Sequence, residues 1–432
     1  MRRAAAAAWA LAAVVAAVPS RASGEETFEA SAYEKKALEW KGYAEFRPEE
    51  QLLRRDSAGF LLQFPGQTRT ALARANGAAE LAGVLRHETL SLSFTGHATY
   101  QLDYSGQDVD ARVYDGYAAW QAGPRAVLEV GKRSLRWGKG YAFSPVAFLE
   151  RPRDPTDPEL SREGFVMAGG ELVQSFDGPV KTLALTALVL PTTWGLNPDF
   201  GPSGHVDVAA KLYGLVLDTD VDLICTAPGT QGLRFGADFS RNLGSNVEIH
   251  GEWALATGAP RMVLAPGSVS GSGVGLAPET RRTMSYLVGL RYLTERETTF
   301  ILEYYRNGNG YSEEEFRQFF ALARAGSTDP AALAVASRAA AQGYSRPNAM
   351  RNYLYLRISQ NEPFDILYLV PALTAIVNTD DGSFSVIPEV TYTEVKNLEL
   401  RLRFAVNRGD AFTDYGEKPV VARAELRARY YF

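Results

Sequence analysis

Basic side chains alternate with apolar ones in three stretches of the C-terminal half of the sequence. The stretches are "RNYLYLRISQ" (351–360), "NLELRLRF" (397–404) and "AELRARYYF" (424–432), together with Arg423 just before the last one. Because residues two apart share one face of a β-strand, each stretch places its arginines in a row. The seven arginines are Arg351, Arg357, Arg401, Arg403, Arg423, Arg427 and Arg429. Such rows in a wall of low dielectric constant attract anions and orient dipolar solutes.

Carboxylates are expected on the same inner face as these arginines. The alternation places Glu129, Asp238, Glu248, Glu252, Glu303 and Glu389 there. The alternative interpretation is therefore that the charges pair across strands and only stabilise the sheet. Both interpretations require a sheet with one polar face.

A second charged segment, "ERPRDPTDPELSRE" (150–163), interleaves charges with prolines that stiffen the chain. We expect it in the third external loop of a barrel, folded inward so that it narrows the lumen. An outward, solvated loop is the alternative. The residues expected to form the constriction are Glu150, Arg151, Arg153, Asp154, Asp157 and Glu159.

Residues for catalysis or metal binding are scarce. The sequence has four histidines and one cysteine, Cys225, and no metal-ligand cluster is recognisable. A hydrolase would have to pair inward His250 with Ser285 on the neighbouring strand, and no motif supports that pair. We therefore predict no enzyme activity and no cofactor. The formal net charge of −5 also lacks the basic excess of a nucleic-acid-binding protein.

The elements that must position the arginines are long strands. In "TLSLSFTGHATYQLDY" (89–104) apolar and polar residues alternate throughout. This length is well above the ~5–6 residues usual in soluble sheets. Long alternating strands suit a membrane barrel, which must close because lipid cannot satisfy free backbone groups. A soluble sandwich or propeller is the alternative, but no blade repeat is visible.

We predict an all-β fold, a closed antiparallel transmembrane β-barrel of about 18 strands, with short periplasmic turns and long extracellular loops. The second strand, near 78–85, is the least clearly indicated, and without one hairpin the number of strands would be 16. The expected strands lie near 38–47, 78–85, 89–104, 110–121, 125–138, 164–176, 180–190, 205–217, 221–227, 231–240, 246–257, 282–293, 298–307, 350–360, 364–377, 383–394, 398–407 and 419–432.

Two further segments fall outside the strand pattern. Residues 312–343 predict a helical hairpin in a long external loop, with Ser312 and Glu315 as a capping box. The hairpin would plug the mouth, dock a partner or pack on the surface. The Gly/Ser-rich tract "APGSVSGSGVGLAP" (265–278) predicts a flexible external loop.

The N-terminal residues are typical of an export signal. "MRR" precedes an apolar run, and small residues follow Pro19. We expect a cleaved signal peptide at 1–22, a short periplasmic segment at 23–37 and the barrel at 38–432. Removal of Arg2, Arg3 and Arg21 would change the net charge from −5 to −8. The expected location is the outer membrane of a Gram-negative bacterium.

Two resemblances to known proteins support this location. The aromatic end, with Tyr430 and Phe432, resembles the signal by which outer-membrane barrels reach their assembly machinery. "RVYDGYAAWQAGPRAVLEVGKRSLRWGKGYAFSP" (112–145) resembles a hairpin of proteobacterial porins, including the alginate-export type. The matching positions are Tyr117, Gly131, Arg133, Trp137, Gly138, Gly140 and Pro145. The alternative, purely structural interpretation is that Trp137 is a membrane-boundary aromatic.

The resemblance and the alternation together predict an outer-membrane porin for passive diffusion of small hydrophilic solutes. The rows of arginines indicate that these solutes include anions. Its partners would be membrane lipid, the barrel assembly machinery and the solutes. A structural sheath around a periplasmic or lumen-bound partner, as in porin–cytochrome conduits, is an alternative, and the hydrolase is another.

Overall fold

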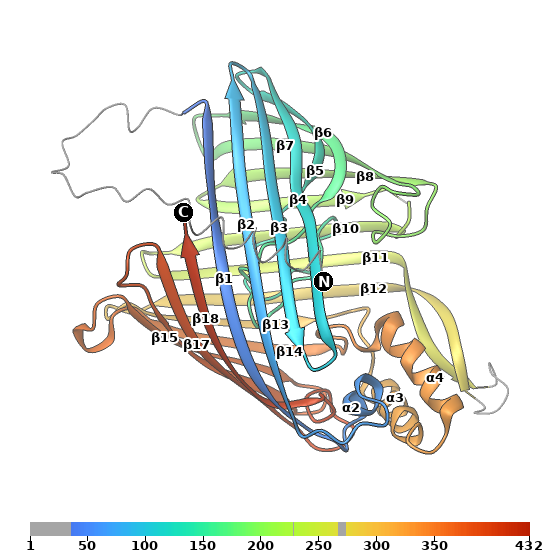
Figure 1. Ribbon diagram of the computed structural model, residues 1–432. Coiled ribbons are helices and arrows are strands. Elements are labelled where there is room, and N and C mark those ends of the chain that lie inside the picture. The colour runs from blue at the N-terminus through green and yellow to red at the C-terminus, as the bar shows by residue number, and fades with distance from the viewer. Residues whose placement is uncertain (1–35, 228, 267–273) are drawn as a thin grey trace, which may run out of the picture.

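The computed structural model describes residues 36–227, 229–266 and 274–432. The predicted signal peptide, and all but the last two residues of the predicted periplasmic segment, lie outside these residues. Eighteen β-strands within the described residues form one closed antiparallel barrel, in which each strand pairs with the next and β18 pairs with β1 (Figure 1). The predicted fold class is therefore confirmed.

The strands are β1 Leu38–Leu53, β2 Ala71–His87, β3 Leu90–Asp103, β4 Gly106–Gly123, β5 Ala126–Arg133, β6 Phe165–Ser175, β7 Val180–Thr192, β8 His205–Val216, β9 Thr219–Thr226, β10 Leu233–Leu243, β11 Val247–Pro266, β12 Val274–Leu293, β13 Thr298–Arg306, β14 Asn352–Gln360, β15 Leu369–Asn378, β16 Phe384–Tyr392, β17 Leu398–Arg408 and β18 Val420–Tyr431.

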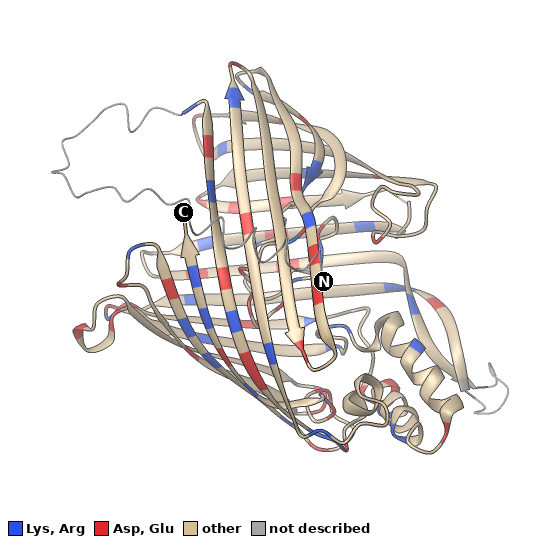
Figure 2. Ribbon diagram, viewed as in Figure 1, with Lys and Arg blue, Asp and Glu red and all other residues tan. Residues whose placement is uncertain are grey.

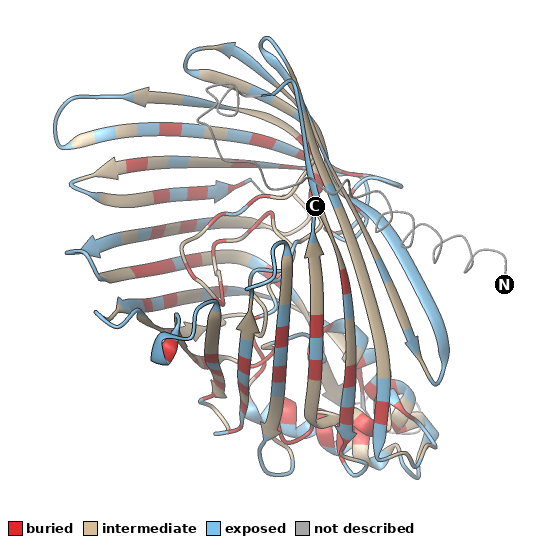
Figure 3. Ribbon diagram, turned by 60° about the vertical axis from the view of Figure 1, so that its left-hand side comes forward, coloured by how far each residue is buried: buried red, intermediate tan, exposed pale blue. Residues whose placement is uncertain are grey.

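Alternation along each strand separates an apolar outer face from a polar inner face. In β17, Leu400 and Leu402 are 37% and 43% exposed, whereas Arg401 and Arg403 are 5% and 3% exposed. Buried and exposed bands alternate in the same way along many strands in Figure 3. Because the apolar side chains point outward and the interior is polar, the barrel has the inside-out arrangement of a membrane barrel.

The strand that the sequence indicated least clearly, β2, is 17 residues long and pairs with both β1 and β3. The 16-strand alternative is therefore wrong. Several strand boundaries differ from the prediction. β5 ends at Arg133 rather than near 138, β11 extends to Pro266 rather than 257, and β12 begins at Val274 rather than 282. The central residues of the expected Gly/Ser loop, 267–273, lie outside the described part of the chain.

The first and last strands close the barrel at the chain end. Tyr43 is opposite Tyr431, and the backbone groups of Gly42 and Phe432 exchange two hydrogen bonds of 3.0 Å. The rings of Trp40 and Phe432 are 5.9 Å apart. The role of Tyr430 and Phe432 as an assembly signal stays a prediction.

The two ends of the barrel differ in the lengths of their connections. Turns after even-numbered strands are short, whereas the loops 54–70, 134–164 and 307–351 after odd-numbered strands are long. The pattern has exceptions: only Tyr104 and Ser105 separate β3 from β4, residues 379–383 separate β15 from β16, and the connection after β14, residues 361–368, is longer than either. Within the described residues, no helix is long and apolar enough to cross a membrane.

Helices lie together at the long-loop end (Figure 1). They are α2 Ala58–Gln63, α3 Glu313–Ala325 and α4 Pro330–Ala339, followed by a π-helical turn, η2 Ala340–Tyr344. Ser312 and Glu315 form the predicted capping box. Phe316 and Phe319 of α3 are buried against Tyr344, and Phe320 is buried beside both of them.

One buried carboxylate joins three of the external loops. Glu417, between β17 and β18, accepts a hydrogen bond from the backbone N–H of Ala58 in α2. It also accepts two from the guanidinium of Arg324 in α3, at 2.7 Å from Nη2 and 2.9 Å from Nε. Its own loop contributes the N–H of Phe412 at 2.8 Å. The helical hairpin is therefore packed onto neighbouring loops.

Candidate functional site

The loop between β5 and β6, residues 134–164, folds into the barrel, and we call it the inner loop. Leu135, Trp137, Val146, Phe148 and Leu149 are buried in a cluster with residues of the wall. Trp137 is only 4% exposed. Its interpretation as a membrane-boundary aromatic is therefore wrong, because the strand ends at Arg133 and the chain turns inward.

Two buried carboxylates of the wall hold the first half of the inner loop, residues 137–146, which we call the anchor segment. Glu252 of β11 accepts hydrogen bonds from the backbone N–H groups of Lys139 and Gly140, both at 2.7 Å. Its second oxygen accepts from the Ser144 hydroxyl at 3.0 Å. A carboxylate that accepts several bonds satisfies loop N–H groups that would otherwise be buried without partners.

Glu303 of β13 binds the next part of the anchor segment. It accepts hydrogen bonds from the N–H of Tyr141 and, at 2.9 Å, from that of Ala142. His250 Nε2 of β11 lies 3.0 Å from the same carboxylate. Lys139 adds an ion pair to Asp222 of β9 at 2.9 Å. The acidic strands β9, β11 and β13 therefore fix this half of the loop.

The glycines of the anchor segment permit this close approach. Gly138 has φ +93°, and a Cβ there would lie 2.6 Å from Glu252 Oε1. A Cβ at Gly140 would lie 2.2 Å from the carbonyl oxygen of Phe143. A side chain at Gly138 would force the backbone away from the carboxylate, and one at Gly140 would force it away from Phe143.

The second half of the inner loop contacts the opposite, basic side of the wall. One oxygen of Asp157, Oδ2, lies 2.9 Å from Arg401 Nη2, 3.4 Å from Arg403 Nη2 and 3.8 Å from Arg427 Nη1. We call these three residues the arginine cluster. Burial acts to raise the pKa of Asp157, but the three arginines outweigh it and hold the pKa below its usual range.

The arginine cluster belongs to a connected network of ion pairs with one more arginine than carboxylates. Blue and red bands alternate along β1, β17 and β18, which supply most of it (Figure 2). The arginines are Arg47, Arg357, Arg401, Arg403, Arg427 and Arg429, and the carboxylates are Glu45, Asp157, Glu389, Glu399 and Glu425. Both sequence interpretations are thus visible: the arginines form rows, and they pair across strands.

Two of the predicted lumen arginines stand outside this network. Arg423 of β18 faces Glu49 of β1 at 3.8 Å. Arg351 precedes β14, where it lies 3.8 Å from Glu315 of α3 and bonds the Gly310 carbonyl. Arg351 therefore contacts the external helical loop rather than the row on β14.

The six predicted constriction residues divide by their contacts, and of these six only Asp157 contacts the arginine cluster. The Glu150 side chain is buried and forms an ion pair with Arg162 at 3.0 Å, and burial raises its pKa against the influence of Arg153. Arg153 bonds the Gly140 carbonyl, and Arg151 pairs with Asp199 at 3.2 Å. Asp154 and Glu159 are exposed.

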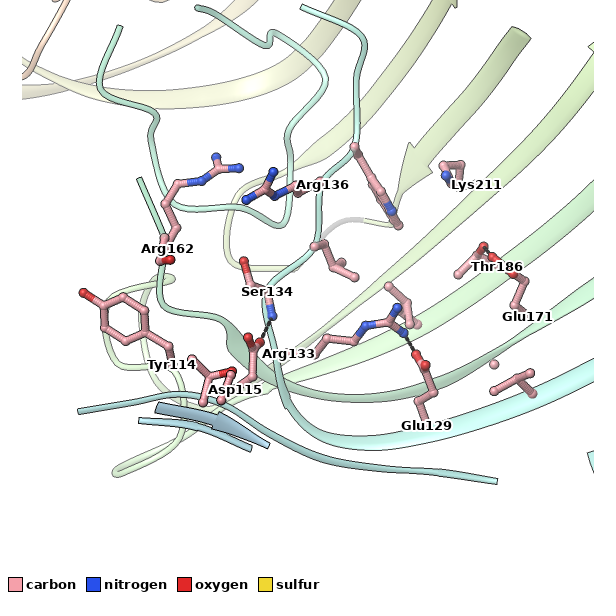
Figure 4. A pocket seen from close by; sticks show the side chains of 18 of the residues that line it. Tyr114, Asp115, Glu129, Arg133, Ser134, Arg136, Arg162, Glu171, Thr186 and Lys211 are labelled. Carbon is pink, nitrogen blue, oxygen red and sulfur yellow. Dashed lines mark hydrogen bonds and ion pairs between the residues drawn. The ribbon is translucent and has the colours of Figure 1, made fainter. Parts of the chain in front are cut away.

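Cavities lie beside both halves of the inner loop. The larger, about 620 Å³, is bounded by strands β1–β8 and by loop residues that include Arg136, Trp137 and Arg162. Figure 4 shows Arg136 and Arg162 on one side of this cavity and Lys211, Glu171 and Thr186 on the other. A second cavity, about 280 Å³, is lined by Asp154, Pro155 and Thr156, by residues of β1 and β15–β18 and by neighbouring loops. Both volumes suit small polar solutes rather than a folded partner.

The structure does not assemble the proposed hydrolase pair. His250 lies opposite Gly289 of β12, whereas Ser285 lies opposite Ala254. The Ser285 hydroxyl accepts a hydrogen bond from the N–H of Gly308 at 2.9 Å. The pairing of His250 with Ser285 is therefore wrong. Among the residues described, no group of three or more His, Cys, Asp or Glu side chains is arranged to hold a metal ion.

Sequence reasoning placed Glu252 and Glu303 on the inner face but did not identify their role in binding the loop. A signal was present, because a glycine-rich segment with many unpaired N–H groups requires acceptors when it is buried. The wall carboxylates Glu45, Glu399 and Glu425 were not singled out as partners of the arginine rows. Their pairing depends on cross-strand register, which the alternation alone does not give.

Comparison with known proteins supports the fold. No known family model matches the sequence, and no curated protein matches it. OccK2 (OpdF) of Pseudomonas aeruginosa is 13% identical, with 91% of this chain and 97% of that chain covered and a TM-score of 0.51. OccAB1 of Acinetobacter baumannii is 11% identical, with 91% and 96% covered and a TM-score of 0.51.

A BenF-like porin from Pseudomonas fluorescens Pf-5 is 13% identical, with 91% and 98% covered and a TM-score of 0.50. At these identities the comparison shows a shared porin-type fold and nothing beyond it. The resemblance to porins is confirmed at that level. None of these three is an alginate-export protein, so the finer resemblance stays a prediction.

Proposed function

We propose that this protein is a channel of the Gram-negative outer membrane that passes small hydrophilic solutes by diffusion and prefers anions. The observation that carries the proposal is the ion-pair network of β1, β14, β16, β17, β18 and the inner loop, in which six arginines face five carboxylates. An excess of fixed cations in a narrow, low-dielectric passage raises the local concentration of anions.

The barrel surface supports the proposed location. Large apolar side chains point outward around the barrel, as Leu128, Leu185 and Leu402 illustrate. An exposed apolar surface of this extent requires lipid around it. The lipid and the barrel assembly machinery are therefore the partners that we propose beside the solutes.

The contents of the lumen favour a channel over a sheath for a second protein. The inner loop folds into the lumen and packs through Leu135, Val146 and Leu149 against the wall. A partner domain would have to expel this apolar cluster and break the hydrogen bonds to Glu252 and Glu303. Small solutes need neither change, and we propose no chemistry on them.

Liposome swelling tests the proposal with solutes of matched size. Purified protein in liposomes should admit gluconate faster than glucose, and glucose faster than glucosamine, because these solutes differ mainly in charge. Liposomes without protein provide the control. Equal exclusion of all three solutes by a correctly folded, heat-modifiable barrel would contradict the channel proposal, and faster entry of glucosamine would contradict its anion preference.

A further inference from the structure

We infer that Asp157 is a resident occupant of an anion subsite formed by Arg401, Arg403 and Arg427, and that a solute anion takes its place during passage. This inference rests on the proposed channel function and deepens it. The inner loop would then supply a carboxylate that competes with the solute for the same three guanidinium groups.

The contacts of Asp157 resemble those of a bound anion more than those of a structural ion pair. A single oxygen, Oδ2, faces all three arginines at 2.9, 3.4 and 3.8 Å. The Nε atoms of Arg401 and Arg427 are buried without hydrogen-bond partners. Because buried guanidinium donors normally find acceptors, the cluster has donors to spare for a larger or differently oriented anion.

The carboxylate of Asp157 is also free to leave. Its residue is held by two backbone hydrogen bonds, from its N–H to the carbonyl of Asp154 at 3.1 Å and from the N–H of Leu160 to its own carbonyl at 3.2 Å. Neither bond uses the side chain. A change of side-chain rotamer therefore removes the carboxylate from the arginines and leaves the loop in place.

The other carboxylates of the network differ from Asp157 in position, because they belong to strands of the wall. Glu389, Glu399 and Glu425 lie within β16, β17 and β18, and Glu45 lies within β1. Asp157 is the network carboxylate that comes from a loop. Its departure leaves six arginines facing four carboxylates, so the subsite becomes attractive to an incoming anion at that moment.

Competition of this kind weakens the apparent affinity for a solute. When the competent state of a site is only partly populated, the apparent dissociation constant rises in inverse proportion to that population. A diffusion channel benefits, because a solute that binds too tightly does not leave. Asp157 would thus limit the residence time of anions at the arginine cluster.

Block of ion current in planar bilayers tests the inference, with citrate as the probe and the full-length barrel as the sample. In Asp157→Asn the concentration of citrate that halves the current should fall about tenfold or more, which corresponds to about 1.4 kcal/mol. Asp154→Asn is the matched control, because Asp154 lies in the same loop and does not contact the cluster. Its half-blocking concentration should equal that of the wild type.

The double variant Asp157→Asn/Arg403→Gln shows whether the gain acts through the arginines, since it should lose most of the increased block. A half-blocking concentration that Asp157→Asn leaves unchanged or raises would overturn the inference while the channel function stands. If Asp157→Asn does not assemble, Asp157→Ser replaces it under the same criterion. A wild-type barrel that conducts no ions would instead refute the proposed function, and the inference with it.

Discussion

The inner loop touches opposite sides of the barrel through two different kinds of contact. On β11 and β13, wall carboxylates bind the backbone of the anchor segment. On β17 and β18, wall arginines bind a side chain of the loop, Asp157. A backbone contact breaks only when the chain moves, whereas a side-chain contact breaks by rotation. The first contact therefore fixes the loop and the second is exchangeable.

The charges of the two sides follow from this difference. Backbone N–H groups are donors, so the side that fixes the loop must offer acceptors, as Glu252 and Glu303 do. The side that we propose faces the solute offers donors instead, and its arginines are nearly balanced by carboxylates. One barrel thus has an acidic structural side and a basic side that we propose acts on solutes.

Removal of the acidic anchors should have the largest effect. In Glu252→Ala/Glu303→Ala the N–H groups of Lys139, Gly140 and Ala142 lose their acceptors, and each buried unsatisfied donor costs about 1–3 kcal/mol. We expect the anchor segment to detach, the single-channel conductance to rise several-fold and added protease to cleave the inner loop.

Glu248→Ala is the control for the anchors. Glu248 lies on the same strand but accepts from the Tyr141 hydroxyl at 3.1 Å and from no backbone N–H of the loop among the described contacts. Its conductance should stay close to that of the wild type. Wild-type conductance in the double variant would mean that Glu252 and Glu303 do not hold the loop.

Neutralisation of the arginine cluster should change selectivity more than conductance. Arg401→Gln/Arg403→Gln/Arg427→Gln leaves three arginines facing five carboxylates, so the preference should reverse toward cations. Arg423→Gln is the control, because its contact at 3.8 Å is with Glu49 outside the network. An unchanged ion preference in the triple variant would show that the arginines serve only to pair strands.

Mild acid should have the smallest effect. The pKa of Asp157 is lowered below its ordinary value of ~3.9. The contact with the arginine cluster is therefore complete above that ordinary value and is lost only as the pH falls through the lowered pKa. Citrate itself changes charge with pH, so its half-blocking concentration would change for reasons unrelated to Asp157. Chloride selectivity is therefore the better measurement. The chloride selectivity of the wild type should be the same at pH 7 and pH 5. A difference between the two pH values that occurs in the wild type but not in Asp157→Asn would contradict the lowered pKa of Asp157.

The sequence predicted the barrel well because strand alternation is a local property. Leu90, Leu92 and Phe94 point outward as their spacing required, and even the weak second strand is present. The inner face of Arg401, Arg403 and Arg427 followed from the same rule. Their contact with Asp157 did not, because it joins residues 244 positions apart in the case of Arg401.

The glycine-rich end of β5 shows why other features could not be predicted. Trp137 fits the alternation of a strand that continues to the membrane boundary, yet the chain leaves the wall after Arg133. The departure depends on Glu252 and Glu303, which lie more than a hundred residues further along the chain. Only the closed barrel brings these carboxylates to the N–H groups that they bind.

The reversal potential of the wild-type barrel in a planar bilayer under a potassium chloride gradient tests the central claim most directly. At about 0.1 M salt the Debye length is ~10 Å, so the charges of the arginine network still act across the passage. The account predicts an open channel whose reversal potential is displaced toward the chloride equilibrium potential. A displacement toward the potassium equilibrium potential, or a folded barrel that conducts no ions, would contradict it.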